Sequence, residues 1–468
     1  MKRHICFLLA FLLFISFCFT ACSSGQNAAS TAVSQTTSQP QAGSSSSQSL
    51  SEPALISSAA EDPEAELSQR EKDWRADFAY FKRHYLMYHP DPFYYVSEEE
   101  FDWQIGQLVK KVDQLSDMDL YFEFAKIVAG LGDNHTSVHT PNDFNDRIFP
   151  VGVKYFGEKL YLCGYLKGYE QFDPYQLHEI VSINGVDIKY LQKKAESVLY
   201  PTNEWCSKDW FGEVFFNPCF FDWACRNTEA GYTVQLLDDD QRVVSLELPV
   251  IAYDPDTLVV VKPENWDKLP RLQETGVSFY ETEKGSYVYL ALIGATMYDR
   301  GNFYHELMQE VSSLLTEHPG SKLVVDLREH PGGDDRVVED IKSDFPLLKE
   351  SYEPKTYVLT GGGTMSASIH MLLVFKEEFG AVQAGEPTGQ FTSLWGYSNP
   401  VTMTMPRSQI SFNVATHFVE NTSKNLFYDE NGKLYEWENT VLPDVYVSQN
   451  IEDIKAGKDS VIEWVLEH

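Results

Sequence analysis

The sequence predicts a multi-part α/β (α+β) protein, and three observations carry this prediction. Apolar residues recur at helical spacing in the N-terminal part, short β-rich segments follow, and strands alternate with helices in the C-terminal half. The chain has 468 residues, of which 43 % are hydrophobic and 23 % charged, which is typical of a protein with a substantial core. We expect a helical region at 71–147, a β-rich module at 148–252 and an α/β core at 253–468.

The chain is strongly acidic, and this charge excludes some partners. Asp and Glu number 69 against 37 Lys and Arg, which gives a formal net charge of −32. Nucleic-acid binding depends on fields of Lys and Arg facing phosphates, so we expect no nucleic-acid partner.

The first 21 residues are predicted to be a signal peptide. Lys2 and Arg3 precede an apolar run of about 15 residues, which is too short for a comfortable membrane span. The run ends in Phe-Thr-Ala-Cys22, which resembles the lipobox of bacterial lipoproteins and implies that Cys22 is lipidated. An ordinary signal peptide with a chance cysteine is the alternative. Residues 22–70 are rich in Ser, Gln and Thr, so we expect a flexible tether that holds the protein at the extracytoplasmic face of the membrane.

Three helices are expected to open the folded body. Aromatic residues recur every three or four positions from Trp74 to Tyr88, and apolar residues do so from Phe101 to Leu115 and from Leu120 to Leu131. Ser97 and Ser116 precede the second and third runs, each with an acidic residue three positions later, which is typical of a helix start. These stripes predict a packed core rather than a cofactor site.

The middle of the chain contains a strand, an Asn-Gly turn and a second strand within Ile180–Ile188. This hairpin resembles one found in PDZ domains, which implies a module that captures the C-terminus of a peptide by strand addition. Cys163, Cys206, Cys219 and Cys225 match no zinc spacing, so no metal is expected. Disulfides and buried thiols both remain open for them.

The C-terminal part alternates strands with helices, as βαβ units do. The expected strands are Ser286–Ile293, Lys322–Leu327, Thr356–Thr360 and Ala381–Gly385, with helices at 302–315, 365–379 and 459–467 and a hairpin within 401–416. Ligands collect where buried parallel strands end, so the segments after these strands are candidate sites.

Ser366 is the candidate nucleophile. It follows Gly361-Gly362-Gly363 at a strand-to-helix junction, where free N–H groups and the helix dipole favour negative charge. Gly332-Gly333 lies after another strand and could supply a second N–H donor. A plain helix cap and a plain turn are the structural alternatives. The triple glycine lacks the lysine of a nucleotide loop, and the serine lacks the Gly-x-Ser-x-Gly setting of an α/β-hydrolase.

A serine nucleophile needs a base, and histidine is the better candidate. No lysine occurs between Lys376 and Lys424, and we expect Lys376 to be solvated. His135 follows the third helix in a Gly-Asp-Asn-His turn, and the other candidates near the relevant strands and helix are His330, His370 and His417.

These segments resemble the tail-specific (C-terminal-processing) protease family, whose relatives include the tricorn protease core and interphotoreceptor retinoid-binding protein. The resemblance rests on Gly132–Thr136, Asp326–Gly333 and Thr364–Ala367, and extends from about Trp74 to His468. It implies a ClpP/crotonase-like catalytic core. Phe391 stands about where the Ser-Lys branch carries its lysine, and His330 stands where the family usually has Asn.

The tricorn-like branch therefore gives the expected roles. The resemblance implies Ser366 as nucleophile, His135 as general base, Glu420 as the acid that orients it, and the N–H groups of Gly333 and Ala367 as oxyanion hole. It implies acyl transfer on protein or peptide substrates without a cofactor.

Three functions remain open at this point. The first is a membrane-anchored serine endopeptidase. Whether it recognises the C-terminal tails of its substrates is an open part of this hypothesis. The second is a non-catalytic ligand- or peptide-binding lipoprotein on the same scaffold. The third is an esterase-like or processing activity on a cell-wall substrate.

Overall fold

The computed structural model describes most of the chain after residue 66. The residues outside its description are 1–66, 142–145, 227–230, 255–257, 271–274, 295–301, 352–354, 398–401, 420–423, 429–433 and 439–440. The predicted signal peptide, the tether, Cys22 and Glu420 all lie outside the described residues.

Three helices open the described chain, as predicted. They are α2 (Gln69–Tyr88), α3 (Glu98–Val109) and α4 (Asp117–Ala129). The hydroxyl oxygens of Ser97 and Ser116 accept hydrogen bonds from the backbone N–H groups three residues later, so both predicted caps are confirmed. The aromatic stripe of α2 is buried against α3 and α4.

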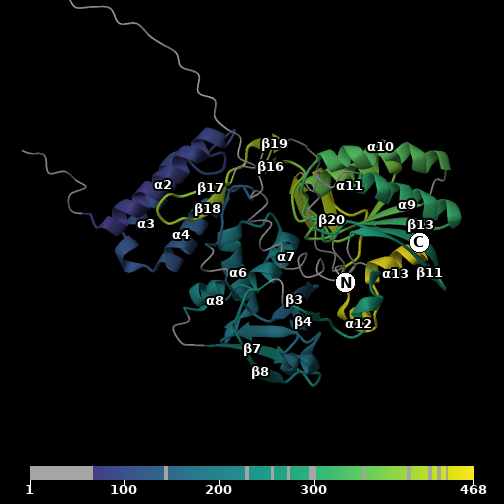
Figure 1. Ribbon diagram of the computed structural model, residues 1–468, viewed down its shortest axis with the longest axis horizontal. Helices are drawn as coiled ribbons and strands as arrows, with labels where there is room; N and C mark the ends of the chain where they lie inside the picture. The colour runs from purple at the N-terminus through teal and green to yellow at the C-terminus, as the bar shows by residue number, and fades with distance from the viewer. Residues whose placement is uncertain are drawn as a thin grey trace, which may run out of the picture.

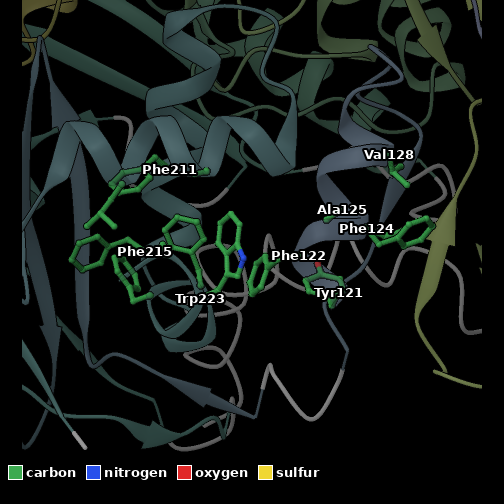
Figure 2. Close-up of a cluster of buried hydrophobic side chains, with 14 of the residues drawn as sticks. Tyr121, Phe122, Phe124, Ala125, Val128, Phe211, Phe215 and Trp223 are labelled. Carbon is green, nitrogen blue, oxygen red and sulfur yellow. The ribbon is translucent and has the colours of Figure 1, made fainter. Parts of the chain in front are cut away.

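The helical region shares one core with the β-rich part. Figure 2 shows side chains of α4 facing those of α7 (Glu204–Val214) and α8 (Pro218–Cys225). Phe122 stacks on Trp223 with ring centroids 4.7 Å apart. The same cluster of buried side chains continues into the strands that follow, so the helices and the strands stabilise each other.

The β-rich part contains two small antiparallel sheets. One has the order β10-β4-β3 and the other β6-β5-β7-β8. Asn184 and Gly185 both have positive φ, as an Asn-Gly hairpin turn requires. The second strand of the predicted hairpin is only two residues long, because Asp187 caps a helix, α6, that begins at Ile188. The strands are β3 (Val151–Phe156), β4 (Lys159–Leu166), β5 (Ile180–Ile183), β6 (Val186–Asp187), β7 (Tyr232–Leu237), β8 (Val243–Leu248) and β10 (Val260–Val261), and α6 spans Ile188–Leu199.

The C-terminal part is built on a six-stranded sheet of order β11-β12-β13-β14-β15-β22. β11 pairs antiparallel with β12, and all other pairs are parallel. The predicted strands and βαβ pattern are therefore confirmed. The strands are β11 (Gly276–Thr282), β12 (Gly285–Ala291), β13 (Lys322–Asp326), β14 (Thr356–Thr360), β15 (Val382–Gly385) and β22 (Val445–Tyr446).

Helices cover both faces of this sheet. Three helices, α9 (Phe303–Glu317), α10 (Arg336–Ser351) and α11 (Ala367–Phe379), lie together on one side, and α13 (Ser460–Glu467) lies on the other (Figure 1). Val288, Val325 and Val358 point towards the first group, whereas Tyr289, Val324 and Tyr357 point towards α13. This mixed α/β architecture confirms the predicted fold class.

A hairpin from the C-terminal part returns to the N-terminal helices. Its strands, β17 (Thr402–Thr404) and β18 (Ser411–Asn413), lie beside the N-terminal helices (Figure 1) and form a sheet with β1 (Ser137–Val138). Phe412 packs among the aromatic rings of α2. This return fixes the chain directly after the predicted catalytic turn. The remaining elements are β2 (Arg147–Ile148), β9 (Ile251–Ala252), β16 (Leu394–Gly396), β19 (His417–Val419), β20 (Lys424–Tyr428), β21 (Leu434–Glu438) and α12 (Ile451–Lys455).

Two further observations bear on earlier expectations. Within the described part of the chain, no helix is both long enough and apolar enough to cross a membrane. All four cysteines of the described chain are thiols rather than disulfides, and three of them are buried.

Candidate active site

Ser366 lies at the tight junction between β14 and α11. Its backbone has φ 52° and ψ −126°, a conformation that non-glycine residues rarely adopt. It occupies the N-cap position of α11, yet its side chain makes no capping hydrogen bond. A serine that was only a helix cap would be expected to make that bond, so the capping alternative loses support. Backbone strain of this kind clusters at functional sites.

Hydrogen bonds to the segment that follows β13 hold the strained junction in place. The Thr364 hydroxyl donates to the carbonyl of Leu327 over 2.8 Å and accepts from the N–H of Gly361. The N–H of Met365 donates to the carbonyl of His330 over 3.2 Å. These bonds connect the turn at Ser366 to the loop that carries Gly332 and Gly333, of which Gly333 is a predicted oxyanion donor.

Gly332 touches the serine directly. A Cβ at this position would lie 2.6 Å from Cβ of Ser366 and 2.8 Å from the backbone nitrogen of Ala367, and the φ of Gly332 is +104°. Only glycine permits this approach. Gly333 follows with φ 120°. Among the described residues, the N–H of Ala367 has no hydrogen-bond partner, as expected for the first residue of a helix.

The loop that carries these glycines is held by a buried charge network. Arg328 donates to both carboxylate oxygens of Asp326 and reaches Asp459 over 2.9–3.0 Å. The Tyr289 hydroxyl donates to Asp326. Burial opposes the charge on Arg328, but Asp326 and Asp459 raise its pKa well above the ordinary value. The Asp-x-Arg part of the motif therefore supports the loop and does not face the serine.

His135 lies in a hydrogen-bonded turn after α4. The buried carboxylate of Asp133 accepts from the backbone N–H of His135 and from the Thr136 hydroxyl, and His89 Nε2 lies 3.3 Å away. Thr136 also accepts from the N–H of Ala415, so the returning hairpin holds the turn. Burial opposes ionisation of Asp133, but the adjacent rings of His89 and His135 bring its pKa below the ordinary value. Burial lowers the pKa of His135, and the charge of Asp133 opposes this.

Gln390 joins the serine turn to the histidine turn. Its Oε1 accepts from the N–H of Ser366 over 2.7 Å. Its Nε2 donates to Oδ1 of Asn134 over 2.9 Å and lies 3.3 Å from Nδ1 of His135. The Nδ1 atom also lies 3.1 Å from Oδ1 of Asn134. The structure therefore brings Ser366 and His135 into one network, although no hydrogen bond joins their side chains among the described residues.

Gln390 is held in place by backbone contacts between two loops. A Cβ at Gly389 would lie 1.8 Å from the carbonyl oxygen of Gly362, and the N–H of Gly389 donates to Thr364. The start of α7 packs on the same loops, because Asn203 donates to the carbonyl of Thr388 over 2.8 Å. The middle part of the chain thus contacts the candidate site through α7.

An acidic side chain of α7 also approaches these loops. Cβ positions at Gly362 and Gly363 would lie 3.3–3.5 Å from atoms of Asp209. Burial and the nearby carboxylate of Glu329 raise the pKa of Asp209 to about 7, with Lys154 opposing. Within the described chain, no group of three or more His, Cys, Asp or Glu side chains is arranged to hold a metal ion.

The other predicted bases are placed elsewhere. His370 contacts Asp335, and His417 is exposed on β19. His330 is a buried residue of the loop that carries Gly332 and Gly333, and its Nδ1 accepts from the N–H of Gly332. Burial lowers the pKa of His330 to about 3, so it stays neutral. Lys376 is hydrogen-bonded to Gln383 and Asp444 rather than freely solvated.

Asn134 and Gln390 are the two residues that the sequence did not single out as part of the site. Asn134 belonged to a recognised motif, but its amide carries no chemistry that a pattern would highlight. Gln390 lies 24 positions after Ser366 in a loop of Gly, Pro and Thr, and only the packing of that loop reveals its contacts.

Comparison with known proteins shows a shared fold. No protein-family model and no curated protein matches the sequence. The structure of mature CPAF matches with a TM-score of 0.57 and 13 % identity, covering 86 % of this chain and 97 % of that chain. Mature CPAF complexed with lactacystin matches with a TM-score of 0.56 and 13 % identity, covering 86 % and 98 %. The photosystem II D1 C-terminal processing protease matches at 13 % identity over 81 % and 94 % of the chains, but its TM-score of 0.38 is too low to support an argument.

Proposed function

We propose that the protein is a serine peptidase that acts on protein or peptide substrates outside the cytoplasm. Ser366 is the nucleophile, His135 the general base, and the N–H groups of Ala367 and Gly333 form the oxyanion hole. The observation that carries the proposal is the Gln390 side chain, which contacts both the Ser366 backbone and the His135 ring. The CPAF fold is consistent with it.

The chemistry follows from these positions. His135 accepts the proton of the Ser366 hydroxyl as its oxygen attacks the peptide carbonyl, and the resulting oxyanion binds the backbone donors at the start of α11. His135 then protonates the leaving amine, and water releases the acyl group. The N–H of Ser366 is engaged by Gln390 and so is left out of the oxyanion hole.

Anchoring and substrate capture complete the proposal. Cys22 is lipidated and tethers the enzyme to the outer face of the cell membrane through residues 22–70. The β-rich module at 148–252 binds the C-terminal tail of a substrate. The contact of α7 with the loop that carries Gln390 supports this role, because it links the module to the site. Glu420, the orienting acid expected from the family resemblance, lies outside the described residues, and within the described chain Nδ1 of His135 contacts Asn134 and Gln390.

A binding protein without catalysis is the second candidate. The absence of a hydrogen bond between the Ser366 hydroxyl and the His135 ring in the described chain favours it. Catalytic hydrogen bonds are often long before substrate binds, however, so this observation does not outweigh the strained serine.

A fluorophosphonate probe separates the two candidates, because it phosphonylates only activated serines. We expect labelling of the wild type, none in Ser366→Ala and strongly reduced labelling in His135→Ala. His370→Ala is the matched control and should label like the wild type, since His370 pairs with Asp335. A wild type that never labels favours the binding protein. Loss of labelling in His370→Ala with normal labelling in His135→Ala would reject the assigned base.

A further inference from the structure

The backbone N–H of Ser366 sets the direction of the hydrogen bonds between Ser366 and His135. A backbone N–H can only donate, so the Gln390 atom that faces it must be the amide oxygen. The amide nitrogen of Gln390 then points at Asn134, whose facing atom must be an oxygen. The orientations of two side-chain amides, which are normally ambiguous, are therefore determined by one fixed donor.

The same reasoning extends to the histidine ring. Nδ1 of His135 lies 3.1 Å from Oδ1 of Asn134 and 3.3 Å from Nε2 of Gln390. The shorter contact is to an acceptor, which favours a proton on Nδ1. A neutral ring protonated at Nδ1 carries its lone pair on Nε2, and no hydrogen bond engages Nε2 among the described residues.

We propose that Gln390 and Asn134 are positioning residues that keep the proton of His135 on Nδ1, so that Nε2 is available as a base. This rests on the proposed function. In serine proteases a carboxylate holds the histidine in the required tautomer, and the wrong tautomer is nearly inactive. Here a neutral amide performs that task, with its orientation imposed by Gln390. Neither residue touches the reacting atoms.

The tautomer can be observed without any catalytic reaction. Nitrogen NMR of the full chain with isotope-labelled histidine distinguishes Nδ1–H from Nε2–H, and comparison with His135→Gln assigns the signals. We expect the Nδ1–H form for neutral His135 in the wild type. An Nε2–H form would overturn the proposal. This readout is independent of labelling by the fluorophosphonate probe, so the proposal and the proposed function can fail separately.

A double-mutant cycle tests the role of Gln390. An aspartate at position 134 has only acceptor oxygens, so its orientation needs no partner. We expect Gln390→Met to lower kcat about 10-fold or more with KM nearly unchanged, and to cost less than about 3-fold in the Asn134→Asp background. The conservative Asn134→Asp variant alone should keep substantial activity, whereas Asn134→Leu should lose about 100-fold or more in kcat.

A structural role for Gln390 predicts a different result. If Gln390 only supports the Ser366 turn, Gln390→Met lowers kcat by the same factor in the wild type and in Asn134→Asp. This outcome contradicts the proposal that Gln390 acts through Asn134. Thermal unfolding of each variant identifies any that fail to fold. In that case Gln390→Glu replaces Gln390→Met, and the tautomer of His135 is read by NMR. A His135 ring that remains Nδ1–H in Asn134→Leu also contradicts the proposal that Asn134 holds the proton on Nδ1.

Discussion

Gly332 lies so close to Ser366 that a Cβ on the glycine would be 2.6 Å from the Cβ of the serine. The same added atom would lie 2.8 Å from the backbone nitrogen of Ala367, one of the two proposed oxyanion donors. The glycine therefore defines how near the oxyanion loop comes to the nucleophile. Any side chain here must push the loop away from the start of α11.

Gly332→Ala tests this relationship. We expect probe labelling and kcat to fall about 100-fold, because displacement of one oxyanion donor has an effect of that order. Gly168→Ala is a matched control, since its φ of +103° is nearly the same but an added Cβ meets no atom within 4 Å. The control should lose about 1–2 kcal/mol of stability from backbone strain and keep its activity. Equal activity losses in both variants would show that strain, and not the contact with Ser366, is responsible.

Arg328 is expected to be a major contributor to stability. Replacing it by Met leaves Asp326 and Asp459 buried without their partner, which should cost about 3–5 kcal/mol in the free energy of unfolding. Arg242→Ala, which removes an exposed pair with Asp240, should cost less than about 1 kcal/mol. Chemical denaturation of the three proteins measures both values. A loss below that of the surface control contradicts a supporting role for the network.

The pKa of His135 sets the lower limit of the pH range in which the enzyme is active. Catalysis needs the neutral ring, so kcat/KM rises with pH through the pKa of His135. Burial lowers this pKa and Asp133 only partly opposes the shift, so the midpoint should lie below the ordinary histidine value of about 6.5. His370→Ala should give the same profile. A midpoint above the ordinary value would mean that another charged group, or another base, controls the reaction.

His330 makes stability depend on pH in a defined direction. In the fold burial lowers its pKa to about 3, whereas in the unfolded chain it takes up a proton below about 6.5. The contribution of neutral His330 to the free energy of unfolding is therefore complete above pH 6.5 and is lost as the pH falls towards 3. Relative to His330→Asn, the wild type should lose up to about 1.4 kcal/mol per pH unit in this window. A stability difference that does not change with pH would contradict this assignment.

Local patterns in the sequence are sufficient to predict most elements and to select the segments that form the candidate site. The segments at Asn134–His135, at Gly332–Gly333 and at Ser366 are each only a few residues long, so a local pattern in the sequence is enough to identify them. The strand Thr356–Thr360 was predicted to the residue, because a buried parallel strand is a continuous apolar run.

The contacts between distant segments could not be predicted in this way. The role of Gln390 depends on Gly389 packing against Gly362, and the amide orientation depends on the N–H of Ser366. The return of β17 and β18 to the N-terminal helices depends on Phe412 fitting among aromatic rings. No local spacing in the sequence predicts contacts between segments that are this far apart along the chain.

The position of the covalent adduct tests the central claim most directly. Peptide mapping by mass spectrometry after fluorophosphonate treatment identifies which residue is modified, and the rate of modification reports on the base. We expect a single adduct on Ser366, formed at least about 100-fold more slowly in His135→Ala than in the wild type. An adduct on another residue, or a rate that does not depend on His135, would contradict the account.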